Sequence, residues 1–306
     1  NIKTSIRIEK QISIMKLNEN ICHYLKNNPR LIAIFLVVFV AFLLSIDGIL
    51  VRVLSNNLNP FVIVFFRTFF ALLIFLPWIL RNQSILQSNY SIAHVIRGAL
   101  KIIALALLFL AIKTENLVDV TSIWFTSPIF LMCAATLFLG ERLNLKRILA
   151  GIIGFIGVLV ILRPGQASAS LNLSWALLGA MTIATILIML KIMVKKDTTE
   201  TLTAWNLIVS VPIAAVPAYL FWTMPTFDEY LMLFVQGILN IGLMISMTKA
   251  YSLADASFLA PIDFIRLPII SFFAYIMFGE TPSFFGVIGA ILIFTSVFII
   301  TSEKKY

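Results

Sequence analysis

Five ionisable side chains lie well inside long apolar stretches of the sequence: Asp47, Arg67, Lys101, Asp263 and Arg266. A charge at the centre of a bilayer costs about 2.5 to 3.5 kcal/mol on insertion scales, so it is rare there without a partner or a function. Asp263 and Arg266 belong to the segment APIDFIRLP and stand three residues apart, which places them on the same face of a helix. These residue types indicate either ion pairing within the protein or the binding of a charged small molecule.

Counting along the helix axis separates these residues into two layers. At 1.5 Å per residue, Asp47 and Arg67 lie about 9 and 10 Å from the outer ends of their segments. Lys101 and Arg266 lie roughly 18 Å down, and Asn240 falls at roughly the same 18 Å depth. The outer layer therefore holds opposite charges, and the central layer holds two cations with Asp263 close by.

Each layer allows a structural and a functional interpretation. Asp47 and Arg67 could form a buried ion pair that only fixes two helices, or Asp47 could serve proton coupling or bind a substrate amine. Asp263 and Arg266 could neutralise each other on one helix. Because Asp263 can neutralise only one neighbour, however, Lys101 or Arg266 would remain free to bind an anionic group, Arg bidentately and Lys as a point charge.

One tryptophan and two prolines accompany the charges. Trp124 lies about 9 Å from the outer face, where it could stack on a substrate ring or cover a cation, or simply be an interfacial tryptophan. Pro261 and Pro268 bracket Arg266, and each removes a backbone donor and frees a carbonyl, which is tolerated at depth where a cavity or partner satisfies it. They could kink the helix for a structural or coupling purpose, or reflect how common prolines are in membrane helices.

The elements that must position these residues are long apolar segments. Of the 306 residues 60% are hydrophobic and only 12% are charged, with a mean hydropathy of +1.02, which excludes a soluble domain. A hydrocarbon core about 30 Å thick needs roughly 20 apolar residues in a helix. Continuous apolar runs without period-two alternation predict helices rather than a membrane β-barrel. The sequence offers ten such runs: 31–53, 60–80, 92–113, 118–139, 145–163, 172–194, 200–221, 228–251, 255–278 and 283–302.

The basic residues predict how these spans are oriented. The net charge is +9, and with ten spans 17 of the 23 Lys and Arg residues fall on the side of the basic tail, residues 1–30. Because positive charge accumulates in cytoplasmic flanks, the tail and both termini are predicted to be cytoplasmic. The excess of basic residues thus reflects the topology of the chain in a bacterial inner membrane, with a secondary attraction to anionic lipid. It gives no reason to expect a nucleic-acid partner.

The two halves of the chain resemble each other at an offset of 139 residues. LFLGE at the end of the fourth segment matches IMFGE at the end of the ninth, and the same offset places Arg67 on Asn206 and Lys101 on Asn240. Each half holds five segments, an odd number, so the second half enters the membrane from the opposite side. We therefore expect an all-α membrane protein of ten transmembrane helices, built as two inverted five-helix repeats, 31–163 and 172–302, around a central cavity.

These features together resemble the EamA-type transporters of the drug/metabolite transporter superfamily. The resemblance rests on FLGE and FGE at the ends of the fourth and ninth segments, on the glycine-rich GIIGFIG of the fifth, and on APIDFIRLP ahead of FGETP. It covers about residues 31–302 and implies ten helices around a central cavity, with the fifth and tenth at the periphery. Within the family, APIDFIRLP is most similar to bacterial uptake proteins for metabolites such as S-adenosylmethionine or riboflavin.

The sequence accordingly predicts a secondary transporter and not an enzyme. Its cargo should be a small polar organic metabolite, amino-acid-like or nucleoside-containing and carrying an anionic group, moved by alternating access without ATP because no Gly-rich phosphate loop is present. The first, third, fourth, eighth and ninth segments should line the cavity. The candidate substrate-binding residues are Asp47, Lys101, Trp124, Asn240, Asp263 and Arg266, and the candidate structural or coupling residues are Arg67, Pro261 and Pro268.

Other functional classes have less support. A membrane-embedded aspartyl enzyme would need two adjacent carboxylates, but Asp47 and Asp263 lie roughly 13 Å apart along the membrane normal. His23 and His94 show no zinc-binding spacing, and the two cysteines no metal or disulfide pattern, so neither a metal nor a cofactor is expected. A receptor or scaffold that binds without transport would have the same sequence features. The expected partners are a small-molecule substrate and the lipid bilayer, and a homodimer is left open.

Overall fold

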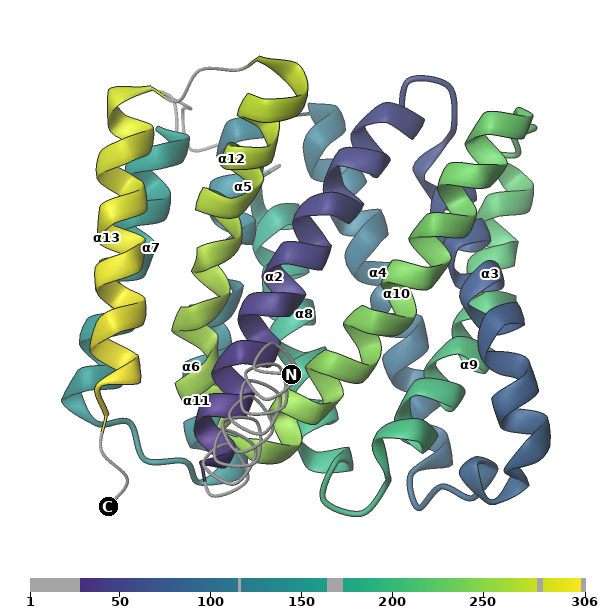
Figure 1. The fold of residues 1–306 in the computed structure, drawn as a ribbon, viewed down its shortest axis with the longest axis horizontal. Helices are drawn as coiled ribbons and strands as arrows, with labels where there is room; N and C mark the ends of the chain where they lie inside the picture. Colours follow the sequence, from purple (N-terminus) through teal and green to yellow (C-terminus); the bar gives the residue numbers. More distant parts are fainter. Residues whose placement is uncertain (1–27, 115–116, 164–172, 280–282, 304–306) are drawn as a thin grey trace, which may run out of the picture.

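The computed structural model describes residues 28–114, 117–163, 173–279 and 283–303, and within these ranges every regular element is a helix (Figure 1). Ten of the helical segments are long and apolar enough to cross a membrane. The expected basic tail lies almost wholly outside the described residues. In the first half the elements are α2 Pro29–Leu54, α3 Pro60–Arg81, η1 Gln83–Leu86, α4 Ser91–Thr114, α5 Leu117–Trp124, α6 Ser127–Leu139 and α7 Leu145–Leu162. In the second half they are α8 Leu173–Met193, α9 Thr199–Leu220, α10 Phe227–Leu253, α11 Ala256–Leu259, η2 Ala260–Ile265, α12 Arg266–Phe278 and α13 Phe284–Thr301.

The fourth and ninth spans are each interrupted. The fourth consists of α5 and α6, which are separated at Phe125 and Thr126, and Pro128 stands in the first turn of α6. The ninth consists of α11, the 3₁₀ helix η2 and α12, and Pro261 stands in the first turn of η2. Proline cannot donate a backbone hydrogen bond and its ring clashes with the carbonyl four residues earlier, which explains why regular α-helix stops at these places.

The helices repeat with a constant offset. α9, α12 and α13 begin and end 139 residues after α3, α6 and α7. The local signals repeat as well, because Gly140 and Gly279 end α6 and α12 in the left-handed conformation, with φ of 67° and 68°. At the start of the next helix, Asn144 and Ser283 cap the first turns of α7 and α13 with their side chains. The equivalent helices of the two halves therefore have the same length and the same spacing along the chain, without insertions.

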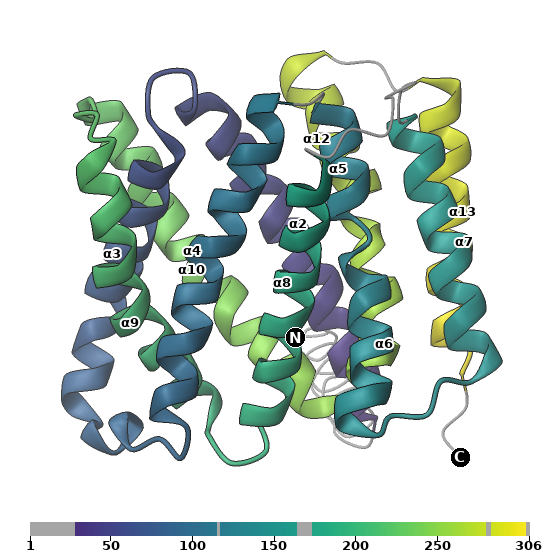
Figure 2. The same ribbon diagram turned by 180° about the vertical axis from the view of Figure 1, so that it is seen from behind.

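The loops show that the second half is inverted with respect to the first. On one side of the bundle the α2–α3 loop meets the start of α10, where Asn57 Nδ2 donates to Glu229 Oε1 at 3.0 Å. On the other side the α8–α9 loop meets the start of α4, where the Asn89 amide donates to Asp197 at 3.0 Å. Equivalent loops thus lie at opposite ends of the molecule, as the opposite directions of α2 and α8 in Figures 1 and 2 also show.

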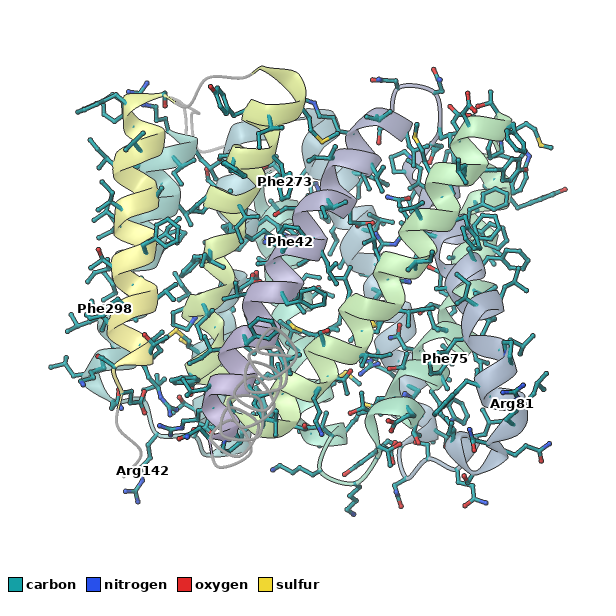
Figure 3. All side chains as sticks on the ribbon, viewed as in Figure 1. Phe42, Phe75, Arg81, Arg142, Phe273 and Phe298 are labelled. Atoms are coloured by element: carbon teal, nitrogen blue, oxygen red, sulfur yellow. The ribbon has the colours of Figure 1, made fainter. Side chains whose placement is uncertain are left out.

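Small residues bring neighbouring helices together. α7 and α13 form a pair at one edge of the bundle (Figure 2), where a Cβ on Gly289 would lie only 2.6 Å from the carbonyl oxygen of Gly157. Apolar side chains such as Phe298 cover the outer face of α13, where lipid would lie (Figure 3). The peripheral position expected for the fifth and tenth spans is therefore confirmed, and the remaining eight spans surround the interior.

Candidate functional site

A cavity of about 260 Å³ lies between the two repeats. Side chains of both halves form its wall, and aliphatic residues and methionines fill the spaces between a set of polar and aromatic groups. That set comprises Arg67, Arg97, Lys101, Trp124, Ser127, Asn206, Asn240, Thr248, Tyr251, Asp263 and Arg266.

The residues singled out from the sequence divide into three groups. Five of the six candidate substrate-binding residues line the cavity together with Arg67: Lys101, Trp124, Asn240, Asp263 and Arg266. Asp47 lies behind the wall and contacts Arg67. Pro261 is buried at the start of η2, whereas Pro268 lines a separate apolar groove between α12 and α13. The structure therefore brings together all the predicted charged groups apart from the Asp47 carboxylate, which reaches the cavity only through its partner.

Asp47 is held by side chains from two other helices. Arg67 Nη1 donates to Asp47 Oδ2 at 2.7 Å, and Gln236 Nε2 of α10 donates to Asp47 Oδ1 at 3.2 Å. The carboxylate is buried, with 5% of the residue exposed. Both oxygens are thus occupied, which corresponds to the structural interpretation of this pair and connects α2, α3 and α10.

Lys101 has a different environment. Its Nζ donates to Asn206 Oδ1 of α9 at 2.8 Å and lies 3.8 Å from the sulfur of Met244. Two cations, Arg97 and Arg67, lie close enough to repel its charge. In the part of the chain that the structure describes, no carboxylate forms an ion pair with Lys101.

Asp263 and Arg266 form the expected pair on one helical face. Arg266 Nη2 lies 3.7 Å from Asp263 Oδ2, and the guanidinium also covers the ring of Phe125 with its Cζ 4.5 Å from the ring centroid. Asp263 belongs to the 3₁₀ helix η2, in which residues three apart are eclipsed, so both side chains point the same way. The distance between the two charged groups is long for an ion pair, and about a quarter of each side chain stays exposed at the cavity wall.

Trp124 is fixed by a glycine on the facing helix. Its six-membered ring packs directly against Gly179 of α8, where even a methyl group would overlap it. The indole ends α5 and lines the cavity beside the break between α5 and α6. Its position allows stacking on a planar group in the cavity.

Arg97 is a cavity residue that the sequence analysis does not single out. It lies near the start of α4, where a basic residue fits the positive-inside rule, but it is 3% exposed and lines the cavity. Its Nη2 donates to the Leu202 carbonyl at 3.3 Å. The available signal was its spacing, because Arg97 and Lys101 stand four residues apart and share one face of α4.

Three spans were missing from the expected lining: the second and the seventh, which contribute Arg67 and Asn206, and the sixth. α8 contributes Ile183, Ile186, Leu187 and Leu190 to the wall. α8 is the inverted counterpart of α2, which does line the cavity, so the internal repeat should have predicted its contribution. No group of His, Cys, Asp and Glu side chains within the described ranges could hold a metal ion.

Comparison with known proteins agrees with this architecture. Residues 31–163 and 170–302 each match the EamA-like transporter family. The chain is 28% identical over 263 residues to an S-adenosylmethionine uptake transporter of Rickettsia prowazekii (strain Madrid E), covering 85% of this chain and 90% of that protein. It is 29% identical over 255 residues to a riboflavin transporter of Brucella anthropi, covering 79% and 88%.

A solved crystal structure shares the fold. It superposes with a TM-score of 0.75 at 17% identity, over 90% of this chain and 96% of the other. The family domain occurs twice in an all-helical chain with ten apolar spans, and the relatives are named as metabolite transporters. The chain therefore belongs to the EamA-like transporter family, within the drug/metabolite transporter superfamily, and is a multi-pass bacterial membrane transporter of small molecules.

Proposed function

We propose that the protein carries a small polar metabolite with an anionic group across the inner membrane by alternating access. Two inverted repeats enclose the cavity, and such repeats allow one half to rock against the other around a fixed site. The breaks at α5–α6 and at η2 border the cavity, with Trp124 and Asp263 beside them. These are positions at which a span can bend without disturbing its ends.

The charge imbalance of the cavity carries the proposal. Four cationic side chains line it, whereas Asp263 is the carboxylate among the described lining residues and Asp47 neutralises Arg67 from behind. Charges in such surroundings need partners, because desolvation is costly and water is scarce. An oxyanion on the cargo would neutralise part of this surplus, through paired hydrogen bonds to a guanidinium or a charge-assisted bond to Lys101. The four cationic residues are Arg67, Arg97, Lys101 and Arg266.

The rest of the wall narrows the cargo class. Trp124 offers a face for an aromatic ring, and Asp263 offers a carboxylate for a cationic group. An amino acid joined to a nucleoside has all three features, as in S-adenosylmethionine, which gives its name to one group of relatives. Riboflavin has a planar ring but no carboxylate. S-adenosylmethionine has a net positive charge because of its sulfonium and ammonium groups, so the cationic side chains favour this class through its carboxylate and not through its overall charge.

Flux measurements on purified protein in lipid vesicles test the proposal. We expect uptake of radiolabelled S-adenosylmethionine, with much weaker uptake of its carboxamide, in which the anionic group is neutral, and of riboflavin. Equal uptake of the acid and the carboxamide would overturn the requirement for an anion.

Arg266 provides the matching variants. Arg266→Lys keeps the charge but loses the planar guanidinium, so it should raise the KM, and Arg266→Ala should abolish transport while the protein stays folded. Lys249→Ala, at an exposed position of α10 outside the cavity, is the control and should transport normally. Normal transport by Arg266→Ala would mean that Asp263 and Arg266 only neutralise each other.

A further inference from the structure

The inverted repeat gives every residue of the Asp47 site an equivalent in the other half. With the offset of 139 residues, Arg67 corresponds to Asn206, Gln236 corresponds to Arg97, and Asp47 corresponds to Ile186. In the first site two donors from α3 and α10 converge on the Asp47 carboxylate. In the equivalent site the donors come from α9 and α4, but isoleucine stands in the place of the carboxylate.

The helix contacts confirm that the two sites are equivalent in space. α10 packs on α2 and α3, and its counterpart α4 packs on α8 and α9. The closest approaches correspond as well, because a Cβ on Gly237 would lie 2.8 Å from Phe70 Cβ, and one on Gly98 would lie 2.7 Å from Cγ1 of Val209, the equivalent of Phe70. The missing carboxylate is thus a difference in chemistry within the same backbone arrangement.

Donors without acceptors remain where the carboxylate is missing. Arg97 is 3% exposed, and neither its Nε nor its Nη1 has a hydrogen-bond acceptor among the residues that the structure describes. The same holds for Nδ2 of Asn206, whose Oδ1 accepts from Lys101. Buried donors are normally paired, and leaving one unpaired costs about 1–3 kcal/mol, more if it is charged. These groups and Ile186 line the same cavity.

We propose that Arg97, Lys101 and Asn206 form an oxyanion-binding site, in which the anionic group of the cargo takes the place that Asp47 occupies in the other half. Two cations and an amide donor match the two oxygens of a carboxylate better than the Arg266 site, where Asp263 already competes. The inference deepens the proposed transport function and rests on it for the cargo, but oxyanion binding can be measured without transport.

Thermal unfolding of the purified full chain in detergent tests the site with simple anions. Sodium acetate should raise the Tm above that in sodium chloride of equal ionic strength, and sodium phosphate serves as the tetrahedral alternative. Arg97→Gln, which installs the residue of the equivalent position, should weaken acetate binding about tenfold or more. Lys249→Gln removes an exposed charge and should respond as the unaltered protein does. If acetate raises the Tm of Arg97→Gln as much as that of the unaltered protein, Arg97 does not bind the anion and the proposed site is wrong. If phosphate raises the Tm more than acetate does, the site does not prefer a carboxylate.

A second variant supplies the missing carboxylate from the protein itself. Ile186→Asp should raise the Tm in chloride and abolish the acetate response, whereas Ile186→Asn, of the same size but neutral, should keep that response. An acetate response that persists in a folded Ile186→Asp protein contradicts the proposal. If Ile186→Asp does not fold, the acetate response of Arg97→Gln alone decides whether the oxyanion site exists.

The two proposals fail in different ways. A protein that binds acetate through Arg97 but moves no anionic metabolite into vesicles retains the oxyanion site and loses the proposed function. If the Arg97→Gln variant transports S-adenosylmethionine as well as the unaltered protein does, the proposed function is retained and the oxyanion site is lost.

Discussion

Asp47 receives hydrogen bonds from Arg67 and Gln236, so its carboxylate is a point at which three helices meet. Asp47→Asn leaves the Arg67 guanidinium without its counter-ion, which typically costs about 3 to 5 kcal/mol when a buried pair is broken. The double change Asp47→Asn with Arg67→Gln should recover most of that stability. Unfolding of the four proteins of the double-mutant cycle in detergent measures the coupling, and additive losses would show that the ion pair contributes nothing.

How much of the site could be predicted depends on where each residue lies in its helix. Asp47 and Arg67 fall at equal depth in consecutive spans, and depth alone suggested that they could pair. The third member, Gln236, is 189 residues from Asp47 in the chain, and the rotation of its helix cannot be read from an apolar sequence. Arg97 gives no signal of its own in the sequence, because a basic residue near a helix end satisfies the topology rule wherever its side chain points.

At the scale of elements, Asp197 connects the α8–α9 loop to the segment before α4. Burial alone would raise the pKa of its carboxyl, but hydrogen bonds from Ser88 and Asn89 outweigh burial and lower it below its ordinary value. A lowered pKa in the folded state means that the ionised carboxylate stabilises the fold above the ordinary pKa, and that this contribution is lost as the pH falls through the lowered value.

The Tm difference between the unaltered protein and Asp197→Asn should therefore be largest near neutral pH and shrink below about pH 4. Thermal unfolding across a pH series measures it. Asp228→Asn, at an exposed position in the first turn of α10, is the control and should change the Tm little at any pH. A difference that stays constant down to the lowest pH would show that Asp197 acts through its shape and not its charge.

Two equivalent glycines differ in what surrounds them. A methyl group on Gly98 would meet only the side chains of Val209 and Ile213, whereas one on Gly237 would meet Phe70 Cβ and the backbone nitrogen of Ala71. Gly237→Ala should force α3 and α10 apart and cost about 1–3 kcal/mol, the usual range for overpacking, and Gly98→Ala should cost less.

The matched double variants check this reasoning. Val209→Ala removes the atom nearest to Gly98 and should rescue Gly98→Ala, but Phe70→Ala keeps its Cβ and should not rescue Gly237→Ala. Thermal unfolding of the single and double variants in detergent measures these differences in stability. If Phe70→Ala rescues Gly237→Ala, the Phe70 ring and not the backbone of α3 prevents the close approach of a methyl group.

The ten spans were predictable because a long apolar run with few charges is enough to indicate a membrane helix, and the structure has ten such helices. The interruption of the ninth span by a 3₁₀ helix was not, because Pro261 signals a break without saying whether the chain kinks or tightens. Residues three apart already share a face of an α-helix, and the 3₁₀ helix brings Asp263 and Arg266 closer to an eclipsed arrangement.

For the whole molecule, the constant offset was visible in the sequence from LFLGE and IMFGE, whereas the unequal chemistry of the two halves became clear only once Asp47 and Ile186 occupied equivalent places. The charges indicate the orientation in the membrane: Arg81 and Arg142 lie at the same end of the bundle (Figure 3), and Arg30 at the start of α2 pairs with Glu303, which follows α13. We predict that this end is cytoplasmic.

Reporters fused after Tyr306 and within residues 195–199 should both report the cytoplasm, and a reporter within 164–172 should report the other side of the membrane. Paired fusions of a periplasmic and a cytoplasmic reporter at each site measure this directly. A C-terminal fusion that is active only in the periplasm would contradict the orientation.

In the proposed alternating-access cycle, the surplus of cations on the cavity wall should make transport sensitive to voltage. In that cycle an empty carrier would move net positive charge when it reorients, whereas a carrier loaded with a cargo of net negative charge would move less, and each elementary charge crossing 100 mV is worth about 2.3 kcal/mol. Net uptake, which needs the empty carrier to return, should respond to a potassium diffusion potential. Exchange of labelled for unlabelled cargo of net negative charge, in which only loaded carriers reorient, should respond less, and equal voltage dependence of uptake and exchange would show that the moving cavity carries no unbalanced charge.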